Sequence, residues 1–137
     1  MGLPKIERIK TAFIEGLIGS GAYSLSDSVV TGVSDDFPAI LYQRDEPVPV
    51  LSRTTAIFSL RDPIGFIDRI FINRGLRKTG LATSIYTAIE QAFRRNGVTA
   101  LALYARKNPQ AETDPQAFWK NRGFTRVSEY DFEKYLT

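Results

Sequence analysis

The chain has 137 residues, the length of a single domain, with 18 lysines and arginines against 15 aspartates and glutamates, for a net charge of +3. It contains no cysteine and no histidine, so disulfides, thiolate nucleophiles, histidine-based triads and cysteine- or histidine-ligated metal sites are excluded. Acid–base chemistry must therefore use carboxylates, tyrosine, lysine, a chain terminus or water. The basic excess suits an anionic ligand but is too small to predict a nucleic-acid-binding protein.

The apolar segments of the chain are short. None approaches the ~20 residues that a membrane-spanning helix needs, and the first residues lack the apolar core of a signal peptide. We therefore expect a soluble, cytoplasmic protein that forms one domain over residues 1–137 and has no membrane partner.

The first half of the chain is expected to form one helix and an antiparallel meander. Apolar residues recur at helical spacing after Pro4, and Gly19 and Gly21 end the pattern. A short helix is expected at residues 25–31, within a segment rich in serine, glycine and aspartate. Strand formers and intervening turn signals then predict three strands, at residues 37–43, 48–60 and 66–72.

The second half is expected to form a strand–helix–strand crossover. Residues 80–96 have helical periodicity that ends at Asn96-Gly97, and the apolar run 98–104 predicts a buried strand, parallel to strand 66–72 if the connection is right-handed. A polar loop at 107–115, a short helix at 116–121 and a strand at 124–127 follow, and the tail has room for one more strand. The predicted class is α/β (α+β): a mixed sheet, flanked by helices, in which the meander precedes the crossover.

The most informative stretch joins strand 66–72 to helix 80–96. Residues 73–80 hold two glycines and three cations directly before the helix, where free N–H groups and the positive end of the helix dipole favour an anion. Gly75-x-x-x-x-Gly80 begins like a P-loop, but Leu81-Ala82 replaces the Lys-[Ser/Thr] pair that a nucleotide triphosphatase needs. The cations could also form only a solvated face. We favour an anion site of another kind.

Two motifs, at residues 77–82 and 117–124, resemble those of a known family. Arg77-x-x-Gly80-x-Ala82 resembles the diphosphate-binding motif Gln/Arg-x-x-Gly-x-Gly/Ala of the GNAT superfamily of N-acetyltransferases. Residues 117–124 resemble the family's Ala-x-x-Leu-Tyr-x-x-x-Gly-Phe segment, and the whole resemblance covers roughly residues 66–124. It implies a GNAT-like fold that binds acetyl-CoA where the fourth and fifth strands separate.

The resemblance also implies which residues bind acetyl-CoA. Arg77 and Lys78 would neutralise phosphate charge, while Phe71 and Ile72 would flank the pantetheine arm. Asn108 matches the family's asparagine after the fifth strand, although it lies farther before Trp119 than is usual. The implied set is Phe71, Ile72, Arg77, Lys78, Thr79, Gly80, Leu81, Ala82 and Asn108. No metal is implied.

Asp68 is the candidate general base. It occupies the strand position where many family members carry a glutamate that deprotonates the amine. Strict alternation along a strand would place Asp68 on the same face as Ile70 and Ile72. The alternative interpretation is an ion pair with Arg53 or Arg61 of the neighbouring strand.

The candidate general acid does not lie at the family's usual position. Trp119 stands where the family usually has the tyrosine that protonates the departing thiolate, and an indole is not a useful acid near neutral pH. Tyr104, at the end of strand 98–104, could supply the missing hydroxyl, or could simply be a half-buried aromatic residue.

These features imply an acetyl-CoA-dependent N-acetyltransferase that acts on an unidentified amine. Transfer would be direct, since the chain has no cysteine to carry the acyl group. The alternative is an inactive CoA-binding module that regulates a partner protein, and a pure interaction or nucleic-acid-binding protein is the weakest interpretation. A homodimer is compatible with the sequence, because the family's first strand is not evident before the first helix.

Overall fold

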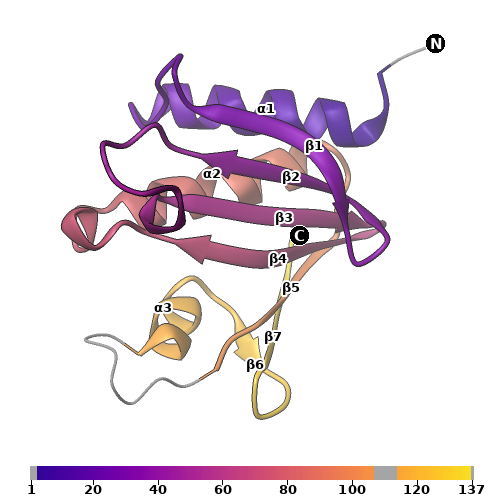
Figure 1. Cartoon of the computed structure of the whole chain (residues 1–137). Helices are drawn as coiled ribbons and strands as arrows, with labels where there is room; N and C mark the ends of the chain where they lie inside the picture. Colours follow the sequence, from indigo (N-terminus) through magenta and orange to yellow (C-terminus); the bar gives the residue numbers. More distant parts are fainter. Residues whose placement is uncertain (1–2, 107–113, 137) are drawn as a thin grey trace.

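A mixed sheet of seven strands forms the centre of the computed structural model, which describes residues 3–106 and 114–136. The strands lie in the order β1-β2-β3-β4-β5-β7-β6 (Figure 1). The elements in chain order are α1 (Lys5–Gly19), β1 (Ser28–Ser34), β2 (Phe37–Gln43), η1 (Val50–Ser52), β3 (Thr55–Arg61), β4 (Ile64–Phe71), η2 (Arg74–Leu76), α2 (Leu81–Arg95), β5 (Ala100–Tyr104), α3 (Pro115–Asn121), β6 (Thr125–Arg126) and β7 (Asp131–Tyr135).

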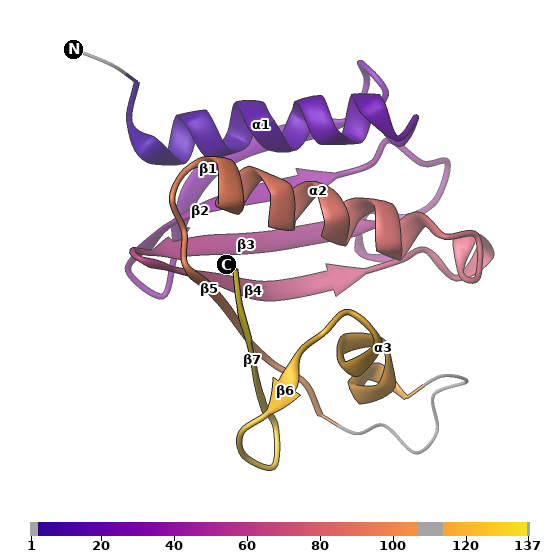
Figure 2. The ribbon, with the colours of Figure 1, turned by 180° about the vertical axis from the view of Figure 1, so that it is seen from behind.

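Strands β1 to β4 form an antiparallel meander, and α2 connects β4 to its parallel neighbour β5. Helices α1 and α2 lie side by side across one face of the meander (Figure 2). Edge-to-face contacts join the two layers: the Phe58 ring of β3 lies 4.9 Å from Phe13 of α1 and 5.7 Å from Phe93 of α2. The predicted fold class is therefore confirmed. In the part of the chain that the structure describes, no helix has the length and apolarity to cross a membrane.

Two predicted elements are wrong. Residues 25–31 do not form a helix: β1 occupies Ser28–Ser34 and pairs with β2 from Ser28↔Gln43 to Ser34↔Phe37. The β-branched residues of this segment favour a strand once such a partner is present. Residues 48–60 do not form one strand either, because a 3₁₀ turn at Val50–Ser52 precedes β3. Pro49, which caps that turn, has no N–H to donate to a sheet.

A bulge in β4 determines where the sheet opens. Ile57 of β3 pairs with Arg69 and the next residue, Phe58, pairs with Ile67, so Asp68 has no opposite residue on β3. The parallel pairing with β5 covers Ile64 to Ile67 and stops there. Beyond this point β4 continues to Phe71 without its β5 neighbour. The last residues of β4, after Ile67, therefore diverge from β5 and leave a gap between the two strands.

Gly65 allows β4 to lie close to α2 at the start of this parallel pair. A methyl group on Gly65 would lie 2.8 Å from the Phe93 ring and 2.9 Å from a Leu101 methyl group. Both distances are shorter than those at which Cβ atoms contact other atoms in folded proteins. We expect Gly65→Ala to lower the free energy of unfolding by about 1–3 kcal/mol through overpacking. Chemical denaturation measures this change.

Gly32→Ala is the matched control, because Gly32 also lies in a strand but a methyl group there meets no atom within 4 Å. It should leave stability unchanged or raise it slightly, since alanine restricts the unfolded chain. Equal destabilisation by both substitutions would show that the close packing at Gly65 is not what matters.

Candidate active site

A cavity of about 850 Å³ lies beside the end of β4, beyond the last β4 residue that pairs with β5. Its walls are the end of β4, the β4–α2 loop, the first turn of α2, and α3. The sequence-predicted residues that line it are Phe71, Ile72, Arg77, Lys78, Gly80, Leu81 and Ala82. Seven of the nine residues predicted to bind acetyl-CoA therefore line one cavity.

The first turn of α2 directs free N–H groups into this cavity. Gly80 caps the helix in the left-handed conformation, with φ of 85°, and has no side chain that could accept a hydrogen bond from the N–H groups of the first turn. The first helical hydrogen bond runs from the Ser84 N–H to the Gly80 carbonyl, so the N–H groups of Leu81, Ala82 and Thr83 have no acceptor within the helix. Together with the helix dipole, these donors favour an anion.

The β4–α2 loop is held in place by Asn73, which sequence reasoning did not identify. The Asn73 side chain accepts a hydrogen bond from the Gly75 N–H at 2.8 Å and donates to the Ser52 carbonyl at 3.2 Å. Its own N–H donates to Thr54 Oγ1 at 3.0 Å, and the buried Glu46 carboxylate holds Thr54 in turn. These bonds tie the loop to the segment between β2 and β3, so the loop is shaped before a ligand binds.

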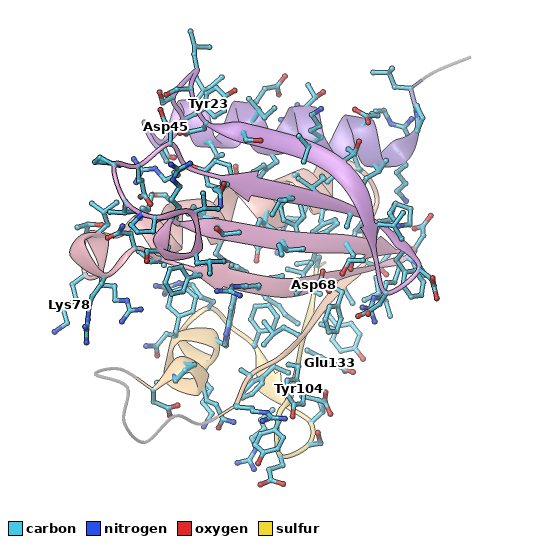
Figure 3. The ribbon with its side chains drawn as sticks, viewed as in Figure 1. Tyr23, Asp45, Asp68, Lys78, Tyr104 and Glu133 are labelled. Carbon is cyan, nitrogen blue, oxygen red and sulfur yellow. The ribbon has the colours of Figure 1, made fainter. Side chains whose placement is uncertain are left out.

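Three cations belong to this loop. Arg74, Arg77 and Lys78 all line the cavity, and Arg77 Nε donates to the Ile72 carbonyl at 3.3 Å. Lys78 has a positive φ of 65° and lies at the tip of the loop (Figure 3). Thr79 does not line the cavity; its hydroxyl donates to the Leu76 carbonyl at 2.5 Å and closes the turn. The mouth of the cavity is thus positively charged.

Helix α3 supplies the opposite wall, with Phe118, Trp119 and Arg122 among its lining residues. Trp119 is 9% exposed and packs edge-on against Tyr86 at 5.7 Å and Phe124 at 5.4 Å. Trp119 is therefore a core residue as well as part of the wall. Sequence reasoning did not assign Phe118 or Arg122 to the site, although an aromatic pair with a nearby cation before Gly123 was the available signal.

Asp68 lies at the bulge and does not line the cavity. Its carboxylate accepts a hydrogen bond from the Ser34 hydroxyl at 3.3 Å and lies 3.7 Å from the Arg61 guanidinium, which confirms the predicted ion pair with Arg61. Burial raises the pKa of Asp68 above its ordinary value, and this effect outweighs the opposing effects of the Ser59 hydroxyl, Arg61 and Ser34.

The prediction that Asp68 shares a face with Ile70 and Ile72 is wrong. Both isoleucines pack against the hydrophobic core, whereas Asp68 lies with Arg61, whose guanidinium stacks on the Phe66 ring at 4.0 Å. The cause is the bulge, which inserts one residue and shifts the alternation of β4.

Tyr104 and Asn108 are the remaining predicted residues. Tyr104 ends β5, is 47% exposed and does not line the cavity; its hydroxyl accepts a hydrogen bond from Arg106 Nε at 3.2 Å. Asn108 lies outside the described residues. Lys78, Asp68 and Tyr104 lie well apart in Figure 3, so the structure does not bring the two predicted catalytic residues to the binding loop.

Comparison with known proteins agrees with this geometry. The model of the acetyltransferase (GNAT) family matches residues 35–124, which include the meander from β2 onward, the loop, α2 and α3. A search of curated protein sequences found no match.

Several solved structures share the fold. An acetyltransferase from Bacillus cereus superposes with a TM-score of 0.56 at 15% identity, over 99% of this chain and 96% of the other. PaiA N-acetyltransferase from Thermoplasma acidophilum, in complex with coenzyme A, gives 0.52 at 12% identity over 96% and 90%. The ribosomal-protein-S18-alanine N-acetyltransferase from Escherichia coli gives 0.53 at 12% identity over 99% and 90%. The family match and the shared fold establish that this chain belongs to the GNAT family of acetyltransferases.

Proposed function

We propose that the chain is an acetyl-CoA-dependent N-acetyltransferase that transfers the acetyl group directly to an amine. The observation that carries this proposal is the cavity between the end of β4 and α3, which leads to a helix N-terminus preceded by three cations. A ligand with an elongated neutral arm and a diphosphate matches both parts. Acyl transfer is the chemistry of the family to which the chain belongs.

Different residues of the site would bind the diphosphate and the pantetheine arm of CoA. The N–H groups of Leu81, Ala82 and Thr83 would bind the diphosphate, with Arg77 and Lys78 neutralising its charge. Beyond Ile67, β4 has no β5 neighbour, so the backbone at Phe71 and Ile72 can pair with the amides of the pantetheine arm. Asn108 stays a predicted contact, and Thr79 would shape the loop.

The proposed reaction needs one proton acceptor and one proton donor. The amine nitrogen attacks the thioester carbonyl, the new N–C bond replaces the C–S bond, and the proton lost by the amine ends on the sulfur of CoA. Asp68 is the proposed base and Tyr104 the proposed acid. Because neither lines the cavity, proton transfer to Asp68 would pass through water. Holding the two reactants together would supply most of the rate enhancement.

A second candidate function is a CoA-binding module without turnover. Two observations favour it: Trp119 is packed into the core where the family usually has a tyrosine acid, and Asp68 is held by Arg61. Binding of CoA without acetylation of any amine in a broad panel, by the wild type and by Trp119→Tyr, would support this function over the enzyme.

Gly80→Asp tests the binding site. Acetyl-CoA should stabilise the wild type, by about 4 kcal/mol at 1,000 times its dissociation constant. Gly80→Asp places a carboxylate where the diphosphate would bind, so we expect at least a tenfold loss of affinity, measured by calorimetry. Gly97→Asp is the control: it has a similar φ of 79° but follows the far end of α2 and does not line the cavity. Equal affinity of Gly80→Asp and the wild type would place the diphosphate elsewhere.

Asp68→Asn tests the base. We expect kcat to fall by roughly 10²–10⁴ while the affinity for acetyl-CoA stays nearly constant. The wild-type rate should fall as the pH drops through the pKa of Asp68, at a higher pH than for an ordinary aspartate, because burial raises that pKa. The variant should lack this acidic limb.

Stability separates the base from a purely structural residue. Since the pKa of Asp68 is raised in the folded state, its ionisation disfavours folding as the pH rises through that pKa, and Asp68→Asn removes the penalty. Asp35→Asn is the control, because Asp35 pairs with the same Arg61 but is exposed. A rate loss in Asp68→Asn that only follows the unfolded fraction, or an equal loss in Asp35→Asn, would contradict catalysis by Asp68.

A further inference from the structure

Arg122 connects the two walls of the cavity. It follows α3 as the C-terminal cap residue, and its guanidinium donates a hydrogen bond to Thr83 Oγ1, in the first turn of α2, at 2.7 Å. The carbon of the guanidinium lies 4.7 Å from the centre of the Phe118 ring. Arg122, Thr83 and Phe118 all line the cavity. The side chain therefore lies beside the same helix turn whose N–H groups face the cavity.

The backbone of Arg122 is fixed independently of its side chain. Lys134 of β7 donates to the Arg122 carbonyl at 2.7 Å and to the Tyr86 hydroxyl at 3.2 Å, and it forms an ion pair with Glu90. The Tyr86 hydroxyl also donates to Glu90, at 2.7 Å. These bonds join β7, α2 and the end of α3 and fix the backbone of Arg122, while the hydrogen bond to Thr83 holds its guanidinium before a ligand arrives.

The charge around Arg122 is unbalanced. Within residues 3–106 and 114–136, no carboxylate lies within 4.0 Å of its guanidinium, and its Nε–H is buried without a hydrogen-bond partner. The first turn of α2 has no acidic residue. A cation beside a helix N-terminus is unfavourable, and a buried unsatisfied donor costs further free energy. The lining carboxylate of Asp114 caps the opposite end of α3. An anionic ligand in the cavity would balance the charge of Arg122.

We propose that Arg122 binds the diphosphate of CoA. The two Nη groups form a planar fork of terminal N–H donors that suits phosphate oxygens, and the Nη group bonded to Thr83 has two hydrogens, so it can keep that bond. The diphosphate then lies between the N–H groups of α2 on one side and the α3 cation on the other. This assignment rests on the proposed function, because it adds a ligand-binding residue to the same cavity.

Three ligands separate the parts of CoA that Arg122 could contact: acetyl-CoA, acetyl-dephospho-CoA, which keeps the diphosphate, and acetyl-pantetheine, which lacks it. Calorimetry with Arg122→Gln should show at least a tenfold loss of affinity for the first two and less than a twofold change for the third. Arg122→Lys keeps the charge without the fork and should lose less. Thr83→Ala removes only the anchor and should change each affinity by less than threefold.

Arg126→Gln is the control, because it removes the same charge from a residue that does not line the cavity. Equal loss for all three ligands would show that Arg122 only shapes the cavity, and an unchanged affinity for acetyl-CoA would also overturn the proposal. A loss for acetyl-CoA but not for acetyl-dephospho-CoA would assign Arg122 to the 3′-phosphate instead. If Arg122→Gln does not fold, Arg122→Lys decides by the same pattern. If the wild type binds none of the ligands, the proposed function itself fails.

Discussion

The structure depends on the point at which β4 stops pairing with β5. The two strands share four paired positions, from Ile64↔Ala100 to Ile67↔Leu103, and the bulge at Asp68 follows directly. Continuous pairing would have satisfied the backbone of β4 and closed the sheet. The interruption instead leaves a gap lined by backbone groups that need partners, and an extended ligand can supply them. The cavity is thus a consequence of sheet register, not of a loop that must move aside.

The second requirement is a fixed arrangement of positive groups at the end of this gap. The Asn73 side chain orders the loop, Gly80 ends it in a left-handed conformation, and the first turn of α2 follows with unpaired N–H groups. The order of these features along the chain brings backbone donors and the Arg77 cation to one place. A site built before binding loses less entropy when the ligand arrives, so affinity does not depend on a large conformational change.

The sequence predicts the locally determined elements well and the tertiary features poorly. Strand Phe37–Gln43 has the predicted bounds, and α2 differs from prediction by one residue at each end, because apolar spacing, Gly80 and Asn96-Gly97 act within each segment. β1 escaped prediction because its serines and glycine form a strand only beside β2. The face of the sheet on which Asp68 lies depends on a bulge in β4, which the alternation of residues along a strand does not reveal. The contact of Arg122 with Thr83 joins residues 39 positions apart, which no local pattern reveals.

The central claim is that the first turn of α2 binds the diphosphate of CoA, and backbone amide NMR of ¹⁵N-labelled protein tests it most directly. Titration with CoA should produce the largest saturable shifts at the N–H groups of Leu81, Ala82 and Thr83, which have no acceptor within the helix. Pantetheine, which lacks the diphosphate, should leave these three resonances nearly unchanged while shifting residues at the end of β4. Saturable CoA binding that leaves the three resonances in place would contradict the account.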